Sequence, residues 1–91
     1  NFANAPLAYS AGLTGTGFYD QNSRLIVTAT NQGTATLSGK ITLKTLPAGT
    51  YVATDLFTGA TIRFAVASGT GVMPVAVARW DTRAFSIVRV S

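Results

Sequence analysis

The only acidic side chains in this sequence are three aspartates, Asp20, Asp55 and Asp81. The chain has no Glu, His or Cys, so the commonest general base, the imidazole metal ligand and the thiol nucleophile are all missing. Glycoside hydrolysis needs two carboxylates that face each other across a cleft. Asp55 and Asp81 instead stand beside predicted turns, where an Asp side chain typically accepts backbone N–H groups. We therefore expect no catalytic residues and a protein that is not an enzyme.

Two further segments resemble ion-binding sequences, and each has a plainer explanation. Asp20-Gln21-Asn22 offers the oxygen ligands that suit calcium, but its spacing does not match a calcium loop, and a turn between strands explains the same residues. The glycine-rich stretch 12–17 lacks the Lys and the helix that a phosphate-binding loop requires. We therefore expect no metal ion and no cofactor.

The aromatic residues offer binding without catalysis. A sugar ring stacks its C–H face on an exposed Trp or Tyr, while polar side chains bond its hydroxyl groups. Trp80 is the only tryptophan and lies in a predicted loop between Arg79 and Asp81, which supply a donor and an acceptor. Tyr19, beside Asp20, is the second aromatic candidate. From sequence alone, the favoured alternative is that Trp80 covers one end of the core or packs against a neighbouring domain.

The composition of the chain limits the partners that it can bind. Its 91 residues are 47% hydrophobic and 11% charged, which leaves room for one core and excludes a disordered tail. The formal net charge is +4, but the seven basic residues are spread along the chain, so we expect no nucleic-acid partner. No apolar run approaches the roughly 18 residues of a membrane span, so we expect no membrane partner.

The elements that must position these residues are β-strands. Alternating apolar and polar residues between turn signals predict strands over 24–30, 34–45, 51–57, 61–66, 72–78 and 83–90. We expect the first two segments to form one hairpin and the next two another, with Pro74 at an edge or a bulge and with core positions for Phe57, Phe64 and Phe85. Within residues 1–22, segments 7–9 and 18–19 are candidates for further short strands. The predicted fold class is all-β: one domain, residues 1–91, that forms an antiparallel two-sheet β-sandwich of immunoglobulin-like type with about seven to eight strands.

The later part of the chain contains motifs of a known type. They are Tyr51-Val52-Ala53-Thr54-Asp55-Leu56-Phe57-Thr58-Gly59, Val75-Ala76-Val77, and Asp81-Thr82-Arg83-Ala84-Phe85-Ser86-Ile87-Val88. The pattern resembles the C-terminal β-sandwich accessory domains of bacterial glycoside hydrolases, and segment 25–39 is similar to a hairpin of such carbohydrate-binding-module-like domains. This resemblance implies a non-catalytic domain beside a separate catalytic domain. It also implies structural roles for Asp55, Gly59, Asp81 and Arg83.

Together these features predict a non-catalytic accessory domain of a secreted bacterial carbohydrate-active enzyme. Such a domain stabilises the adjacent catalytic domain, its first partner, and binds polysaccharide in addition. Two alternatives stay open: a free-standing carbohydrate-binding module with Trp80 as its stacking platform, and a structural module of a bacterial surface or adhesive protein. All three predict a secreted or extracellular location.

Overall fold

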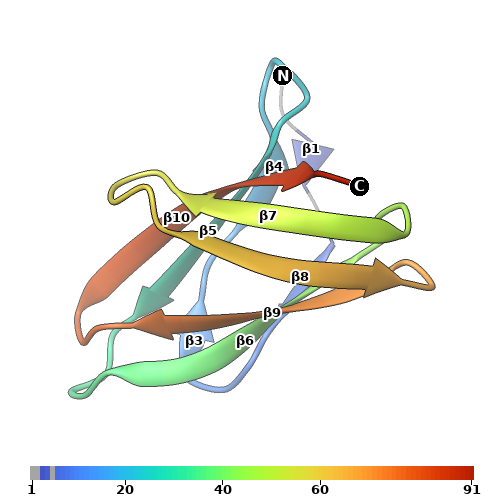
Figure 1. The fold of residues 1–91 in the computed structure, drawn as a ribbon. Helices are drawn as coiled ribbons and strands as arrows, with labels where there is room; N and C mark the ends of the chain where they lie inside the picture. The colour runs from blue at the N-terminus through green and yellow to red at the C-terminus, as the bar shows by residue number, and fades with distance from the viewer. Residues whose placement is uncertain (1–2, 5) are drawn as a thin grey trace.

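The computed structural model describes residues 3–4 and 6–91, and within them the chain has ten strands and no helix (Figure 1). Every strand pairing is antiparallel, so the predicted all-β antiparallel fold is confirmed, with more strands than expected. The strands are β1 (Ala3–Asn4), β2 (Leu7–Tyr9), β3 (Leu13–Thr14), β4 (Gly17–Tyr19), β5 (Leu25–Asn31), β6 (Leu37–Lys44), β7 (Gly49–Asp55), β8 (Thr61–Ala67), β9 (Thr70–Val77) and β10 (Asp81–Arg89).

One continuous sheet winds around the core and forms a nearly closed barrel. Its strand order is β1-β4-β5-β10-β7-β8-β9-β6-β2. Segment 7–14 connects two distant parts of the sheet, because β2 pairs with β6 whereas β3 pairs with β5. In Figure 1, β7, β8 and β9 lie one above another, and β5 and β10 run diagonally behind them.

The barrel has one weak seam, between β8 and β9. These strands share only the pairs Val66↔Gly71 and Ala67↔Thr70, beside the turn that joins them. The rest of β9 pairs on its other side with β6, and Pro74 lies in this one-sided part, where its missing N–H removes no bond to β8. The predicted edge at Pro74 agrees with this arrangement. Because the short ladder is unbroken, the strands form one curled sheet and not two separate ones.

Alternation of side chains along the strands builds the core. In β5 and β9 every second side chain is buried and the residues between them are more exposed, as the pleat of a strand requires. Phe64 and Phe85 are buried as predicted. The core position predicted for Phe57 is wrong, because its side chain is 74% exposed. The largest fully buried apolar side chains include Phe85, Ile41, Leu43 and Met73.

Of the two predicted hairpins, one is confirmed. Strands β7 and β8 pair from Thr54↔Thr61 to Gly49↔Val66 across the predicted turn. The segments predicted to form the other hairpin are strands β5 and β6, but they do not pair with each other. Strand β5 pairs with β10, β4 and β3, whereas β6 pairs with β9 and β2. The connection over 32–36 therefore carries the chain from one part of the barrel wall to another.

The N-terminal part of the chain contacts β5 closely at Thr28. The Tyr9 hydroxyl donates to the Thr28 carbonyl at 2.6 Å, and burial raises the pKa of Tyr9 to about 12. The Thr28 N–H donates to the Thr16 carbonyl at 2.8 Å. Between them Gly15 passes so near the Thr28 carbonyl that a Cβ atom would collide with it. This contact fixes the approach of segment 7–17 to the barrel.

Candidate functional site

The connections of the barrel gather at two ends, and the candidate site lies at one of them. We define the Trp80 end as the connections 32–36, 56–60 and 78–80, which follow β5, β7 and β9. The opposite end consists of the connections 20–24, 45–48 and 68–69. In Figure 1 the Trp80 end lies on the left of the molecule.

Large apolar side chains are exposed at the Trp80 end. Trp80 is 70% exposed, Phe57 74% and Leu56 52%. Trp80 also has a backbone φ of 57°, in the left-handed region that Gly and Asn occupy most readily. A large aromatic side chain that is exposed on a strained backbone does not stabilise the isolated fold. Such a residue is therefore a candidate for ligand binding.

A pocket of about 360 Å³ lies at this end, and Phe57 is one of its lining residues, whereas Trp80 directly precedes the lining residue Asp81 in the chain. It falls within the range of roughly 300–1,000 Å³ that is usual for small-molecule sites. The β7–β8 turn provides one wall and the beginning of β10 provides the other. The lining residues are Asp55, Phe57, Thr58, Asp81, Thr82 and Arg83.

The floor of the pocket is an ion pair between Asp55 and Arg83. Asp55 is 3% exposed, and its Oδ2 lies 2.9 Å from the Nε of Arg83. The Oδ1 atom accepts the N–H groups of Phe57 at 2.7 Å and of Thr58 at 3.0 Å. Burial alone would raise the pKa of Asp55, but these hydrogen bonds and the Arg83 charge together lower it. Asp55 is therefore ionised, and it fixes the turn that presents Phe57.

Arg83 connects this turn to two further parts of the barrel. Its Nη1 donates to the Ala76 carbonyl of β9 at 2.9 Å, and its guanidinium carbon lies 4.8 Å from the centre of the Phe85 ring. The side chain is 22% exposed. A cation over an aromatic ring is stabilised by the ring's electron density. Arg83 therefore joins β7, β9 and β10 at the Trp80 end.

Asp81 lies on the opposite wall of the pocket, directly after Trp80 in the chain. Its Oδ1 accepts the N–H of Thr82 at 2.9 Å. The Thr82 hydroxyl is 2.9 Å from the Thr30 hydroxyl of β5. The predicted role of Asp81 in accepting a backbone N–H is confirmed, while its second carboxylate oxygen has no hydrogen-bond donor within the described part of the chain.

A second depression at the same end, of about 410 Å³, is built around Asn31. The Asn31 side chain is 2% exposed and donates to the carbonyls of Ala35 and Val77, both at 2.9 Å. It also accepts the N–H of Gly33 at 2.8 Å. Since every bond of this amide goes to backbone groups of the protein, we assign Asn31 to holding the connection over 32–36.

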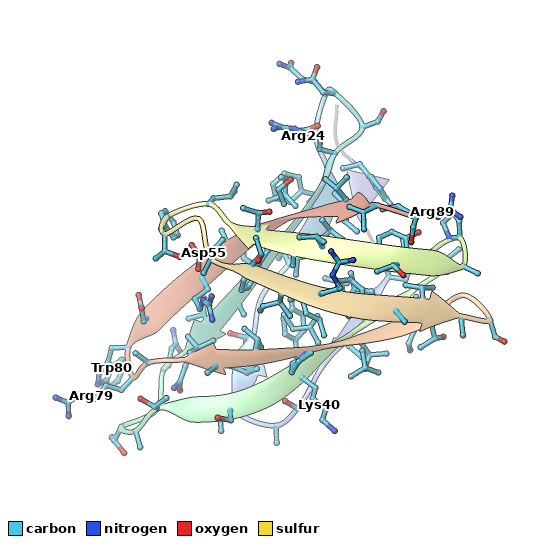
Figure 2. All side chains as sticks on the ribbon, in the orientation of Figure 1. Arg24, Lys40, Asp55, Arg79, Trp80 and Arg89 are labelled. Carbon is cyan, nitrogen blue, oxygen red and sulfur yellow. The ribbon has the colours of Figure 1, made fainter. Side chains whose placement is uncertain are left out.

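The structure brings together only part of the predicted binding set. Asp81 lines the pocket, Trp80 precedes it in the chain without lining the pocket, and Arg79 extends away from the barrel (Figure 2). Tyr19 pairs with Leu25, and Asp81 pairs with Asn31, six residues further along β5. At about 3.3 Å per residue, Tyr19 is roughly 20 Å from the pocket. Tyr19 is also partly buried against the core, so it does not belong to this site.

Phe57 is the pocket residue that sequence reasoning missed. It was assigned to the core because it continues the alternation of Tyr51, Ala53 and Asp55. The signal against that assignment is Asp55 itself, because an Asp that caps a turn ends the strand and leaves the next residues outside the pleat. Leu56 and Phe57 are these next residues.

The third aspartate, Asp20, has a purely local role at the opposite end. It accepts the N–H groups of Asn22 and Arg24, both at 2.9 Å, and forms an ion pair with Arg24 at 2.8 Å. The backbone hydrogen bond from Arg24 is the main cause that lowers the pKa of Asp20. The predicted turn is confirmed. Over residues 3–4 and 6–91, no three possible metal-binding side chains come together.

No helix among the described residues is long and apolar enough to cross a membrane. Comparison of the chain with protein-family models, with curated proteins and with solved structures gave no match. The geometry of the Trp80 end is therefore the basis for the function proposed below.

Proposed function

We propose that this chain is a non-catalytic accessory domain of a secreted bacterial carbohydrate-active enzyme, and that its Trp80 end binds carbohydrate. The observation that carries the proposal is the pocket at this end, which combines the exposed ring of Phe57 with fixed polar groups and has the exposed Trp80 directly before its lining residue Asp81 in the chain. The motifs in the second half of the chain support the enzyme context, since they resemble accessory domains of glycoside hydrolases. An adjacent catalytic domain is then the first partner and a polysaccharide the second.

Each residue of the pocket has a distinct part in this proposal. Trp80 provides the platform for a sugar ring, and Phe57 provides a second apolar surface from the facing turn. Asp81 and Thr58 lie at the pocket and offer polar atoms for sugar hydroxyls. Asp55 and Arg83 bond each other, so their role is to hold the two walls in place.

The backbone at Trp80 strengthens the choice of this residue. Among the described residues, three other non-glycine residues have a positive φ, namely Ser23, Thr45 and Ser68, and all have small side chains. A left-handed conformation costs an L-residue about 1 kcal/mol relative to Gly. A ligand that uses the ring explains why a Trp, with most of its surface in solvent, occupies such a position.

The shape of the fold is compatible with an accessory domain of the sandwich type. The weak seam divides the sheet into β5-β10-β7-β8 on one side and β9-β6-β2 on the other. We interpret these two parts as the facing sheets of a distorted immunoglobulin-like sandwich, joined by the short ladder at one corner.

Titration calorimetry against a panel of polysaccharides tests the binding. We expect at least one ligand to bind, and we expect Trp80→Ala and Phe57→Ala each to weaken binding by about tenfold or more, which corresponds to 1.4 kcal/mol per tenfold. Val88→Ala is the matched control, because Val88 is 51% exposed on β10 but lies outside the pocket. Binding that survives both aromatic substitutions, or no binding at all, would overturn the proposal.

A second candidate is a structural module of a bacterial surface protein, favoured by the outer face of β7, β8 and β10. Arg63 is the only charged residue among the outward-facing positions of these strands, as expected for a face that packs against another domain. The protein sequence encoded next to this segment in the same gene distinguishes the two candidates. A glycosidase barrel next to it supports the accessory domain, and tandem β-domains support the surface module.

A further inference from the structure

The three aspartates differ in whether they form an ion pair, and the proposed function does not depend on this difference. Asp20 is paired with Arg24, and Asp55 is paired with Arg83. Asp81 forms no ion pair among the described residues, although it is exposed and the chain has a net charge of +4. The single unpaired carboxylate thus lies at the pocket, next to Trp80.

The charges that line the pocket favour a particular class of sugar. Two carboxylates, Asp55 and Asp81, and one guanidinium, Arg83, belong to the lining, so the formal sum is −1. The charge of Arg83 is balanced by Asp55, and two of its N–H groups are already bonded to the Asp55 carboxylate and the Ala76 carbonyl. Arg79 extends into solvent away from the barrel (Figure 2) and is not part of the lining.

The remaining positive charge lies elsewhere on the molecule. Arg24 is paired with Asp20 at the opposite end, Lys40 and Lys44 are on β6, Arg63 is on β8, and Arg89 is at the end of β10. Figure 2 shows Lys40 and Arg89 on parts of the surface remote from Trp80. The net positive charge of the chain therefore does not describe the electrostatics of the pocket.

We infer that the ligand is a neutral saccharide, and that Asp81 selects it against acidic polysaccharides. This inference rests on the proposed function, since it names the class of carbohydrate for the same site. An ionised carboxylate is only an acceptor, so Asp81 accepts sugar hydroxyls through the oxygen that Thr82 does not use. The same charge repels the carboxylate of a uronic acid or the sulfate of a sulfated sugar.

Tryptophan fluorescence tests this selection directly, because Trp80 is the only tryptophan in the chain. The probes are neutral oligosaccharides from cellulose, xylan, mannan and starch, compared with polygalacturonate and a sulfated glycan at physiological salt. The variant is Asp81→Asn, whose amide oxygen still accepts the Thr82 N–H. The matched control is Asp20→Asn, which makes the same change in net charge at the opposite end.

The expected result is binding of a neutral oligosaccharide that is at least about tenfold tighter than binding of either acidic polymer. Asp81→Asn should weaken neutral binding, strengthen acidic binding and so reduce this ratio by about tenfold, because charge-assisted hydrogen bonds are roughly twice as strong as neutral ones. Asp20→Asn should leave the ratio unchanged.

Two outcomes would overturn the inference in distinguishable ways. Tighter binding of an acidic polymer, with a ratio that Asp81→Asn does not change, would remove the neutral specificity while leaving carbohydrate binding in place. A fluorescence signal that responds to neither class would remove the proposed function together with the inference.

Discussion

The two ends of the barrel differ in which kinds of side chain they bury and which they expose. At the Trp80 end, the protein buries two polar side chains, Asn31 and Asp55, and leaves Trp80 and Phe57 in solvent. The opposite end follows the usual rule. Leu46 is 9% exposed, while Asp20 and Arg24 form an ion pair at the surface.

At the opposite end, apolar side chains are buried and order the connections. The Leu46 N–H donates to the Gly69 carbonyl at 3.2 Å, which joins two connections and lets the Leu46 side chain enter the core. The Tyr51 ring stacks on Phe64 with centroids 5.7 Å apart, and its hydroxyl donates to the Pro47 carbonyl at 2.7 Å. Apolar side chains thus hold these connections.

The comparison teaches that the Trp80 end is held by polar groups so that its aromatic side chains stay available. When a turn is fixed from inside by a buried carboxylate or amide, its large side chains need not enter the core to order it. Buried polar groups and exposed aromatic side chains are the two informative exceptions on a protein surface, and here they occur together.

The largest expected effect comes from removing the buried carboxylate of the Trp80 end. Asp55→Ala should lower the free energy of unfolding by about 3 kcal/mol, because it leaves Arg83 unpaired and removes the oxygen that accepts two turn N–H groups. Asp20→Ala, at the surface of the opposite end, should cost less. Urea denaturation of both variants measures the difference, and equal losses would contradict the contrast between the ends.

Protonation of Asp55 should reproduce part of this loss of stability. Hydrogen bonds lower the pKa of Asp55 in the folded protein, so its contribution to stability is present above the unfolded pKa of about 3.9 and disappears as the pH falls through the folded value. Unfolding free energies measured from about pH 5 to pH 3 should therefore decrease more steeply for the native chain than for Asp55→Asn. Parallel curves would show that Asp55 is not the titrating group.

The smallest expected effect is a gain in stability. Trp80→Gly should raise the free energy of unfolding by about 1 kcal/mol, because Gly adopts a φ of 57° without steric cost and the ring is mostly exposed. The same variant should lose carbohydrate binding.

Ser68→Gly provides the matched control, since Ser68 has a φ of 53° at the opposite end. It should gain stability without any change in binding. Thermal unfolding and calorimetry of both variants measure these effects. Destabilisation by Trp80→Gly would show that the ring packs on the fold rather than awaiting a ligand.

The sequence predicted the strands well because their signal is local. Alternation over 34–45 predicted β6, and the Thr58-Gly59-Ala60 turn predicted the β7–β8 hairpin. The pairing of β5 with β10 joins residues 50 to 62 positions apart, and no local pattern encodes it. This is why the hairpin over 24–45 was wrong and why a single curled sheet was not foreseen.

The site was predictable only in part for the same reason. Trp80 and Asp81 are neighbours in the chain, so the sequence showed them together, and the separation of Tyr19 from them depends on the register of β4, β5 and β10. Phe57 reaches the pocket because the ion pair between Asp55 and Arg83 holds the β7–β8 turn beside β10. That ion pair joins residues 28 positions apart.

The weak seam between β8 and β9 also bears on how the chain behaves at high concentration. An open strand edge is a template for another molecule's strand, and charged side chains or Pro at the edge reduce such pairing. Here the edge of β9 is blunted, since Pro74 offers no N–H and the Ala76 carbonyl is already bound to Arg83. Arg63 adds a charge on the facing strand. The guanidinium that orders the pocket thereby also keeps neighbouring molecules from joining their sheets.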